Sequence, residues 1–288
     1  MSSIAVAAAG RRVRAPWAAL LATGPIGLIS AAVIAIAVFV TIFGPLIAPS
    51  DPYLGQLANS YVGPQPGAPL GFDGSGRDVL SRVLVGARTS MRGPFAVVIR
   101  CVVAGTLLAV WTAWARGTVD AVVSSALDIL FAFPGILLAI LATAIFGKGL
   151  TAATVALAIA YTPYVARVLR GAALRERSLL YISALEVQGA SAIAICFRHL
   201  IPNMVPLILA QSTTLFGYAM VDLAAISYLS LGVQPPYPDW GVMVSENASG
   251  VVQGYPLPAL SAGLCIVMVV IASSLLGQRL HEYAEARR

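Results

Sequence analysis

The sequence predicts an all-α membrane protein with six transmembrane helices and with its N- and C-termini in the cytoplasm. Of its 288 residues, 59% are hydrophobic and 10% are charged, whereas a soluble domain carries about 25% charged residues. Four runs contain no Asp, Glu, Lys or Arg: residues 15–50, 149–166, 200–221 and 247–278. About 20 apolar residues suffice to cross a bilayer, and a chain in lipid must satisfy its own backbone groups. The runs lack the period-two alternation of barrel strands, so we expect helices.

The first span is expected to stay in the mature protein, because the apolar run before residue 48 is longer than the 7–15 residues of a signal-peptide core. We expect spans at residues 24–47, 92–115, 120–146, 150–168, 203–229 and 257–277. The corresponding segments are a cytoplasmic start (1–23), a first transmembrane helix (24–48), an extracytoplasmic loop (49–91), a five-helix core (92–280) with a cytoplasmic loop (169–202), and a cytoplasmic tail (281–288).

The distribution of basic residues predicts the orientation, since cytoplasmic loops are enriched in Lys and Arg. With the N-terminus inside, twelve arginines lie in inside segments: Arg11, Arg12, Arg14, Arg116, Arg167, Arg170, Arg175, Arg177, Arg198, Arg279, Arg287 and Arg288. Five basic residues lie in outside segments: Arg77, Arg82, Arg88, Arg92 and Lys148. This bias accounts for the net charge of +6 without nucleic acid. Cys101, Cys196 and Cys265 show no paired spacing, so neither disulfides nor a metal site is indicated.

The first outside loop divides into two parts. Residues 49–71 are rich in Pro and Gly and predict irregular chain. Ser75, with Asp78 three residues later, has the spacing of a capping box. The helix that follows would place Val79, Leu80, Val83, Leu84 and Ala87 on one face. We expect an amphipathic helix in the membrane interface or against other spans, either as a simple elbow or as a contact with a partner. In the outside loop before the last span, "GVQPPYPDWG", Tyr237 and Trp240 are expected to join the aromatic belt.

Three charged residues fall within predicted spans: Arg100, Asp128 and Asp222. A charge at a helix centre costs about 2.5–3.5 kcal/mol, so such residues usually face a bundle interior or a pathway. Asp222 could line a pathway or serve as an internal hydrogen-bond partner, and an Arg100–Asp222 pair would relieve both burial costs. Packing or snorkelling is the simpler role for Arg100, and Asp128 lies near the cytoplasmic interface.

The longest cytoplasmic connection, residues 169–202, predicts a helical hairpin. Its first helix would turn Arg175, Glu176, Arg177 and Glu186 to solvent, and Gly189 would end it. Residues 190–200 place Ile193, Phe197 and Leu200 on one face, and Pro202 permits a new helix to begin. An exposed apolar face of this kind usually docks onto another surface.

This segment resembles the EAA loop of bacterial ABC-importer permeases. Ser183, Ala184 and Leu185 stand at the Glu-Ala-Ala positions, Gly189 at the Gly, and "RHLIPN" at the tail. "PLGFDGSGRDVLSRVLVGARTS" (69–90), "AFPGILLAI" (132–140) and "ISYLSLGVQPPYPDWG" (226–241) resemble further segments of the C-type subunit of dipeptide/oligopeptide ABC importers. The resemblance covers about residues 24–280. The departures from the family pattern are Ser183, Leu185, Ala194, Phe72, Ala68 and Leu223.

The resemblance implies a type I ABC importer permease fold and a multi-pass subunit of the bacterial plasma (inner) membrane. It implies a non-catalytic role: half of a peptide translocation pathway, coupled to a cytosolic ATPase through residues 181–200. The implied partners are a homologous second permease, two cytosolic ABC ATPases, an extracytoplasmic peptide-binding protein and membrane lipid, with no nucleic acid. The chain lacks a phosphate-binding loop motif, so no cofactor is expected in it, and ATP and Mg would be bound by the ATPases.

These inferences give three sets of candidate residues and no metal site. ATPase coupling is assigned to Tyr181, Ala184, Leu185, Gly189, Ile193, Phe197, Arg198, His199, Pro202 and Asn203. The translocation pathway is assigned to Arg100, Asp128 and Asp222. Contact with an extracytoplasmic partner is assigned to Asp73, Arg77, Asp78, Arg82, Gln234 and Trp240.

Other functions predict features that this sequence lacks. An ion-coupled secondary transporter would show inverted repeats with paired broken helices and several embedded acids. An intramembrane enzyme would carry a Ser/His, Cys/His or paired-carboxylate set on facing spans. Within the family, an importer of nickel or another small solute is the alternative, but nickel binding by the spans would require His, Cys or Met clusters. Peptides of unspecified length are therefore the expected substrate.

Overall fold

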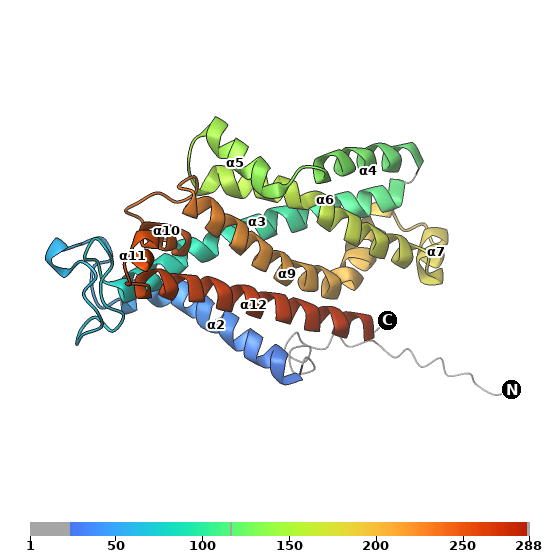
Figure 1. The fold of residues 1–288 in the computed structure, drawn as a ribbon. Helices are drawn as coiled ribbons and strands as arrows, with labels where there is room; N and C mark the ends of the chain where they lie inside the picture. Colours follow the sequence, from blue (N-terminus) through green and yellow to red (C-terminus); the bar gives the residue numbers. More distant parts are fainter. Residues whose placement is uncertain (1–23, 116, 287–288) are drawn as a thin grey trace.

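The computed structural model describes residues 24–115 and 117–286, and the side chains up to residue 282 (Figure 1). Its helices are α2 (Gly24–Ile47), η1 (Leu57–Asn59), α3 (Val79–Ala115), α4 (Gly117–Phe131), α5 (Gly135–Phe146), α6 (Leu150–Arg177), α7 (Leu180–Val187), α8 (Ala192–Ile195), the π-helical η2 (Cys196–Leu200), α9 (Ile201–Tyr228), α10 (Trp240–Glu246), α11 (Ala248–Val252) and α12 (Leu257–Ala286). Across these ranges only two isolated β-bridges occur and no strand. The predicted all-α class is confirmed.

The arrangement of the helices defines two ends of the bundle. α7 lies at one end together with the start of α9 and the end of α12, and is called here the α7 end (Figure 1). α10, α11 and the loop before α3 lie at the opposite end, called the α10 end. Six of the arginines that favoured a cytoplasmic N-terminus lie outside the described residues: Arg11, Arg12, Arg14, Arg116, Arg287 and Arg288. The predicted segment 1–23 also lies outside them, and the orientation stays a prediction.

Five helices are long and apolar enough to cross a membrane, and a sixth span arises if α4 and α5 are counted together. These two helices are bent by 80° at the break between Phe131 and Gly135. The predicted span at 120–146 corresponds to this bent pair of helices. Pro134 precedes α5, and proline removes a backbone donor and disfavours helix at the residue before it. α12 continues to Ala286, so the predicted tail at 281–288 begins within this helix, and its cytoplasmic location stays a prediction.

The helix predicted before the second span is not separate from that span. α3 runs without interruption over 37 residues from Val79 to Ala115, so the predicted end of the outside loop at residue 91 falls within a helix and stays a prediction. Asp78, not Ser75, caps it: the Ser81 backbone N–H donates to Asp78 Oδ2 at 2.8 Å. An aspartate oxygen satisfies one of the free N–H groups in a first helical turn, which fixes the start of α3 at Val79.

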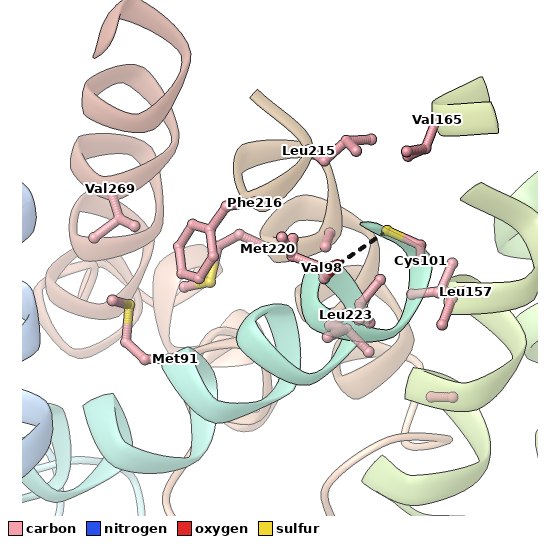
Figure 2. Close-up of a cluster of buried hydrophobic side chains, with 14 of the residues drawn as sticks. Met91, Val98, Cys101, Leu157, Val165, Leu215, Phe216, Met220, Leu223 and Val269 are labelled. Atoms are coloured by element: carbon pink, nitrogen blue, oxygen red, sulfur yellow. Dashed lines mark hydrogen bonds between the residues drawn. The ribbon is translucent and has the colours of Figure 1, made fainter. Parts of the chain in front are cut away.

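The core lies where α3 meets α6 and α9, with α12 packed on α9. Met91, Phe216, Met220 and Val269 fill the contact between α3, α9 and α12 (Figure 2). Small residues let the helices approach closely: a side chain at Gly105 would strike Val165 of α6. Close packing of this kind is what holds helices together in lipid, where burial of apolar surface gives little driving force.

Candidate functional site

The candidate coupling hairpin projects from the α7 end and consists of α7, the turn after it, α8 and η2 (Figure 1). The predicted break at Gly189 is present, with φ of +81°. Ser191 caps α8 by accepting from the Ala194 backbone N–H at 3.3 Å. The single helix predicted through residues 169–188 is wrong, because α6 ends at Arg177 and α7 begins at Leu180. α8 continues through η2 into α9, so residues 192–228 form one apolar helical unit.

Large apolar side chains of the hairpin are open to solvent. The exposed fractions are 88% for Leu180, 89% for Val187, 73% for Ile193 and 60% for Phe197. The predicted face of Ile193, Phe197 and Leu200 is divided, because Leu200 is fully buried. The π-helical turn at Cys196–Leu200 places more residues in each turn than an α-helix. This shift of phase moves Leu200 into the core and leaves Ile193 and Phe197 outside.

A hydrogen-bonded cluster closes the base of the hairpin. Tyr181 Oη donates to Glu176 Oε1 at 2.6 Å, and Asn203 Nδ2 donates to the same oxygen at 2.7 Å and to Tyr181 Oη at 3.0 Å. The His199 ring lies 6.3 Å from that of Tyr181. Burial, followed by the nearby Glu176 carboxylate, raises the pKa of Tyr181 to about 12. The prediction that Glu176 faces solvent freely is wrong, since it links α6, α7 and α9.

Arg177 also has partners, so its predicted free exposure is wrong. Its Nη1 donates to the backbone carbonyls of Ala113 at 2.7 Å and Trp114 at 2.5 Å. Its guanidinium lies 4.3 Å from the centre of the Trp114 ring. A cation at a helix C-terminus satisfies free carbonyls and interacts favourably with the helix dipole. Arg177 therefore ties the end of α3 to the end of α6, just before the hairpin begins.

An apolar groove of about 390 Å³ separates the last turns of α3 from α8 and η2. The exposed side chains of the hairpin form one wall and two tryptophans form the other. Its lining residues are Leu107, Leu108, Val110, Trp111, Trp114, Ala192, Ile193, Cys196, Phe197 and Ile201.

The three charged residues predicted within spans have separate partners. Arg100 Nη1 donates to Thr154 Oγ1 at 3.3 Å, whereas Asp222 Oδ2 accepts from Tyr161 Oη at 2.6 Å. The suggested Arg100–Asp222 pair is therefore not formed. Asp128 pairs with Arg167 at 2.5 Å on an exposed surface and links α4 to α6.

At the α10 end, a buried charge cluster holds the loop before α3. Asp73 Oδ2 pairs with Arg77 Nε at 2.8 Å and lies 3.5 Å from Arg82 Nε. Glu246 Oε2 of α10 accepts from Arg77 Nη2 at 3.0 Å and from Arg82 Nη2 at 2.6 Å. Asp73, Arg77, Asp78 and Arg82 are all buried within this chain. Their predicted direct contact with an outside partner is contradicted by this burial, and Glu246 was not among the predicted residues.

Trp240 is buried rather than part of an aromatic belt, and its predicted partner contact is likewise contradicted. Its Nε1 donates to the Val83 carbonyl at 3.0 Å. Asp239 caps α10 and accepts from Ser90 Oγ at 2.7 Å, and burial raises the pKa of Asp239. Gln234 is engaged in its own turn through the Ser230 carbonyl at 2.9 Å. Tyr237 is exposed, so its place in an aromatic belt stays a prediction.

Comparison with known proteins places these features in a family. The family model described as "Binding-protein-dependent transport system inner membrane component" matches residues 102–288. The glutathione transport system permease protein GsiD of Pectobacterium atrosepticum is 39% identical over 221 residues, 76% of this chain and 73% of the relative. The dipeptide transport system permease protein DppC of Alkalihalophilus pseudofirmus is 34% identical over 245 residues, 85% of this chain and 80% of the relative.

One solved structure gives the fold. It describes inward-facing conformations of the MetNI methionine ABC transporter, and its matching chain has a TM-score of 0.57 at 19% identity. The match covers 70% of this chain and 96% of the other. At this identity the likeness is one of fold, and it confirms the predicted type I importer permease architecture.

Proposed function

This chain belongs to the family of binding-protein-dependent transport system inner membrane components and is a permease subunit of an ABC importer; from that premise we propose that it carries short peptides and is driven through the hairpin. Support for peptides comes from relatives named for glutathione and for dipeptides, both of which are short peptides. The proposal makes the subunit non-catalytic and assigns ATP and Mg binding to separate ATPases. A second permease would supply the other half of the pathway, and a binding protein would deliver the peptide.

The observation that carries the proposal is the exposed apolar hairpin. Leu180, Val187, Ile193 and Phe197 are the side chains that would seat in an ATPase cleft. Isolated exposed apolar residues are common on proteins, but several on one short protruding element support an interaction site. We assign the α7 end to the cytoplasm, because the described arginines at 167, 170, 175, 177 and 198 lie near it and basic residues favour that side.

The hairpin can transmit movement because its second helix is continuous with α9. A displacement of α8 would pass through η2 to α9 without an intervening loop. The cluster of Glu176, Tyr181 and Asn203 joins α7 to the same unit. ATP-driven closure of the ATPases would thus bias α9 between two arrangements, which is the requirement for alternating access.

Gly189 offers the sharpest test of this coupling. No atom lies within 4 Å of a Cβ added there, so a side chain would fit, but its positive φ costs roughly 1–2 kcal/mol for a residue with a Cβ. We expect Gly189→Val to assemble with the ATPases and to hydrolyse ATP. Peptide uptake per ATP should fall by roughly 5- to 30-fold, since each 1.4 kcal/mol of strain corresponds to a factor of ten. The measurement is uptake and hydrolysis by the reconstituted importer.

Gly254→Val is the matched control. Gly254 also has a positive φ, +90°, and open space around its Cβ position, but it follows α11 at the α10 end. It should leave uptake per ATP unchanged. Normal coupling in Gly189→Val, or a complex that purifies without P-loop ATPases, would contradict the proposed role of the hairpin.

A further inference from the structure

We propose that Arg100 and Asp222 form a two-pole binding site within the membrane that recognises the carboxylate and the ammonium ends of an unblocked peptide. The proposal rests on the proposed function and specifies where the substrate is read along the pathway. It differs from an internal ion pair, because each charge is held by a neutral hydroxyl and is left open to a ligand.

Arg100 supplies the positive pole. It lies on α3 and is exposed, and within the described ranges its side chain donates hydrogen bonds only to Thr154 Oγ1 at 3.3 Å and the Ala96 carbonyl at 3.4 Å. Among the described residues, no carboxylate lies within ion-pair distance of it. A guanidinium offers a planar fork that matches a carboxylate with two parallel hydrogen bonds.

Asp222 supplies the negative pole. It lies on α9, is only partly buried, and accepts a hydrogen bond from Tyr161 Oη at 2.6 Å. In the part of the chain that the structure describes, it too has no ion-pair partner. Tyr218, which is exposed, lies one helical turn before it on the same face of α9. A carboxylate flanked by aromatic rings suits an ammonium group, since ring faces also attract cations.

α6 holds the two poles on one side of the bundle. Thr154 and Tyr161, which contact Arg100 and Asp222 respectively, are seven residues apart on this helix. Seven residues are close to two full turns, so their side chains leave the same face, with backbone positions about 10 Å apart along the axis. The face that joins the poles therefore crosses α3, α6 and α9, the three helices of the core.

The exposed surface around these poles is unlike the lipid-facing surface of the same protein. α2 exposes Ile29, Ile36, Phe39 and Leu46 and contains no charged residue. A surface that combines an arginine, an aspartate and tyrosines at membrane depth is costly against lipid and marks a pathway. A ligand with one charge of each sign would neutralise both poles at once. An unblocked peptide has this chemistry, whereas a neutral solute or a metal cation does not.

The test combines single variants with peptides blocked at one end. The complete importer is reconstituted with its binding protein, and ATP-driven uptake of an alanine peptide is compared with that of its N-acetyl and C-amide forms. Arg100→Gln should lower the preference for the free peptide over the C-amide peptide by about tenfold or more, because a hydrogen bond to a charged group is lost. The same variant should leave the preference for the free peptide over the N-acetyl peptide unchanged. Asp222→Asn should do the reverse. Because the same binding protein is used throughout, its own selectivity cancels in these ratios.

Each outcome decides the matter. The blocked peptides compared are those that the binding protein binds, as a titration establishes beforehand. Where wild type does not carry such a blocked peptide, uptake gained by the matching variant supports the site, and no gain overturns it. Preferences that are unchanged, or changed equally for both blocked forms, also overturn it. Ile99→Gln and Val221→Asn, at exposed neighbouring positions, control for a new amide in the membrane and should leave both preferences intact. Failure of wild type to take up any free alanine peptide would instead overturn the proposed function, and the site with it.

Discussion

Replacing Glu246 with glutamine removes the carboxylate that two buried arginines share. Glu246 Oε2 accepts from Arg77 at 3.0 Å and from Arg82 at 2.6 Å, and the Arg82 side chain is completely buried. Without Glu246, Arg82 keeps two long contacts among the described residues, with Asp73 at 3.5 Å and with the Pro52 carbonyl at 3.5 Å. Breaking a buried ion pair by removing one partner costs about 3–5 kcal/mol. Because the Glu246 side chain is 21% exposed and glutamine still accepts one hydrogen bond, we expect about 2–3 kcal/mol.

The loss should appear locally, in the loop that the cluster holds against α10. At about 1.4 kcal/mol for each factor of ten, the loop should open roughly 30- to 150-fold more often. Hydrogen exchange in residues 56–77 reports this opening, because their amides bond within the loop, as from Asp73 to the Arg77 carbonyl at 2.9 Å. Glu282→Gln is the control, since its pair with Arg279 is largely exposed and such pairs contribute roughly 0–1 kcal/mol. Unchanged exchange in Glu246→Gln would refute the reasoning.

Two further predictions concern single side chains. Trp240→Phe should lower the unfolding free energy by about 1–2 kcal/mol, because the hydrogen bond to the Val83 carbonyl is lost. Thermal unfolding midpoints measured in detergent would show this loss. The control Tyr237→Phe, at an exposed position, should leave the midpoint unchanged. The pKa of Tyr181, about 12, lies above that of a free tyrosine, about 10. The hydrogen bond from Tyr181 to Glu176 therefore stabilises the hairpin fully below pH ~10. This stabilisation is lost as the pH rises through about 12. Alkaline absorbance titration of the wild type and of Tyr181→Phe should differ by one phenolate transition near pH 12, and a transition near pH 10 would contradict the contact.

The positions of the spans could be predicted from the sequence because they depend on windows of about 20 residues. The first span at 24–47 coincides with α2, and Gly189 breaks the hairpin where its backbone freedom suggested. The break between α4 and α5 was missed although Pro134 stands there. The apolar run continues through the proline, and hydropathy averages over a bend of this kind.

The roles of the polar residues depended on contacts that no local pattern encodes. Arg82 and Glu246 are 164 positions apart in the chain, so nothing near either residue indicates the other. Four members of the cluster were therefore expected on an outside surface, where charged residues usually lie. Trp240 was misassigned for a related reason. A tryptophan that follows a proline-rich turn can lie in an aromatic belt or can be buried, as here, with its indole bonded to the Val83 carbonyl. The local sequence pattern is the same in both cases.

The position of Asp222 connects the hairpin with the proposed peptide site. Asp222 belongs to the same continuous helical unit as α8, whereas Arg100 belongs to α3. The contacts of α3 with α6 are more extensive than those of α6 with α9, so movement at the hairpin would displace α9 more readily than it would separate α3 from α6. Such a displacement changes the distance between the two poles while Arg100 stays with Thr154. A peptide held by both ends would then lose one contact first, which couples a movement at the α7 end to release of the substrate.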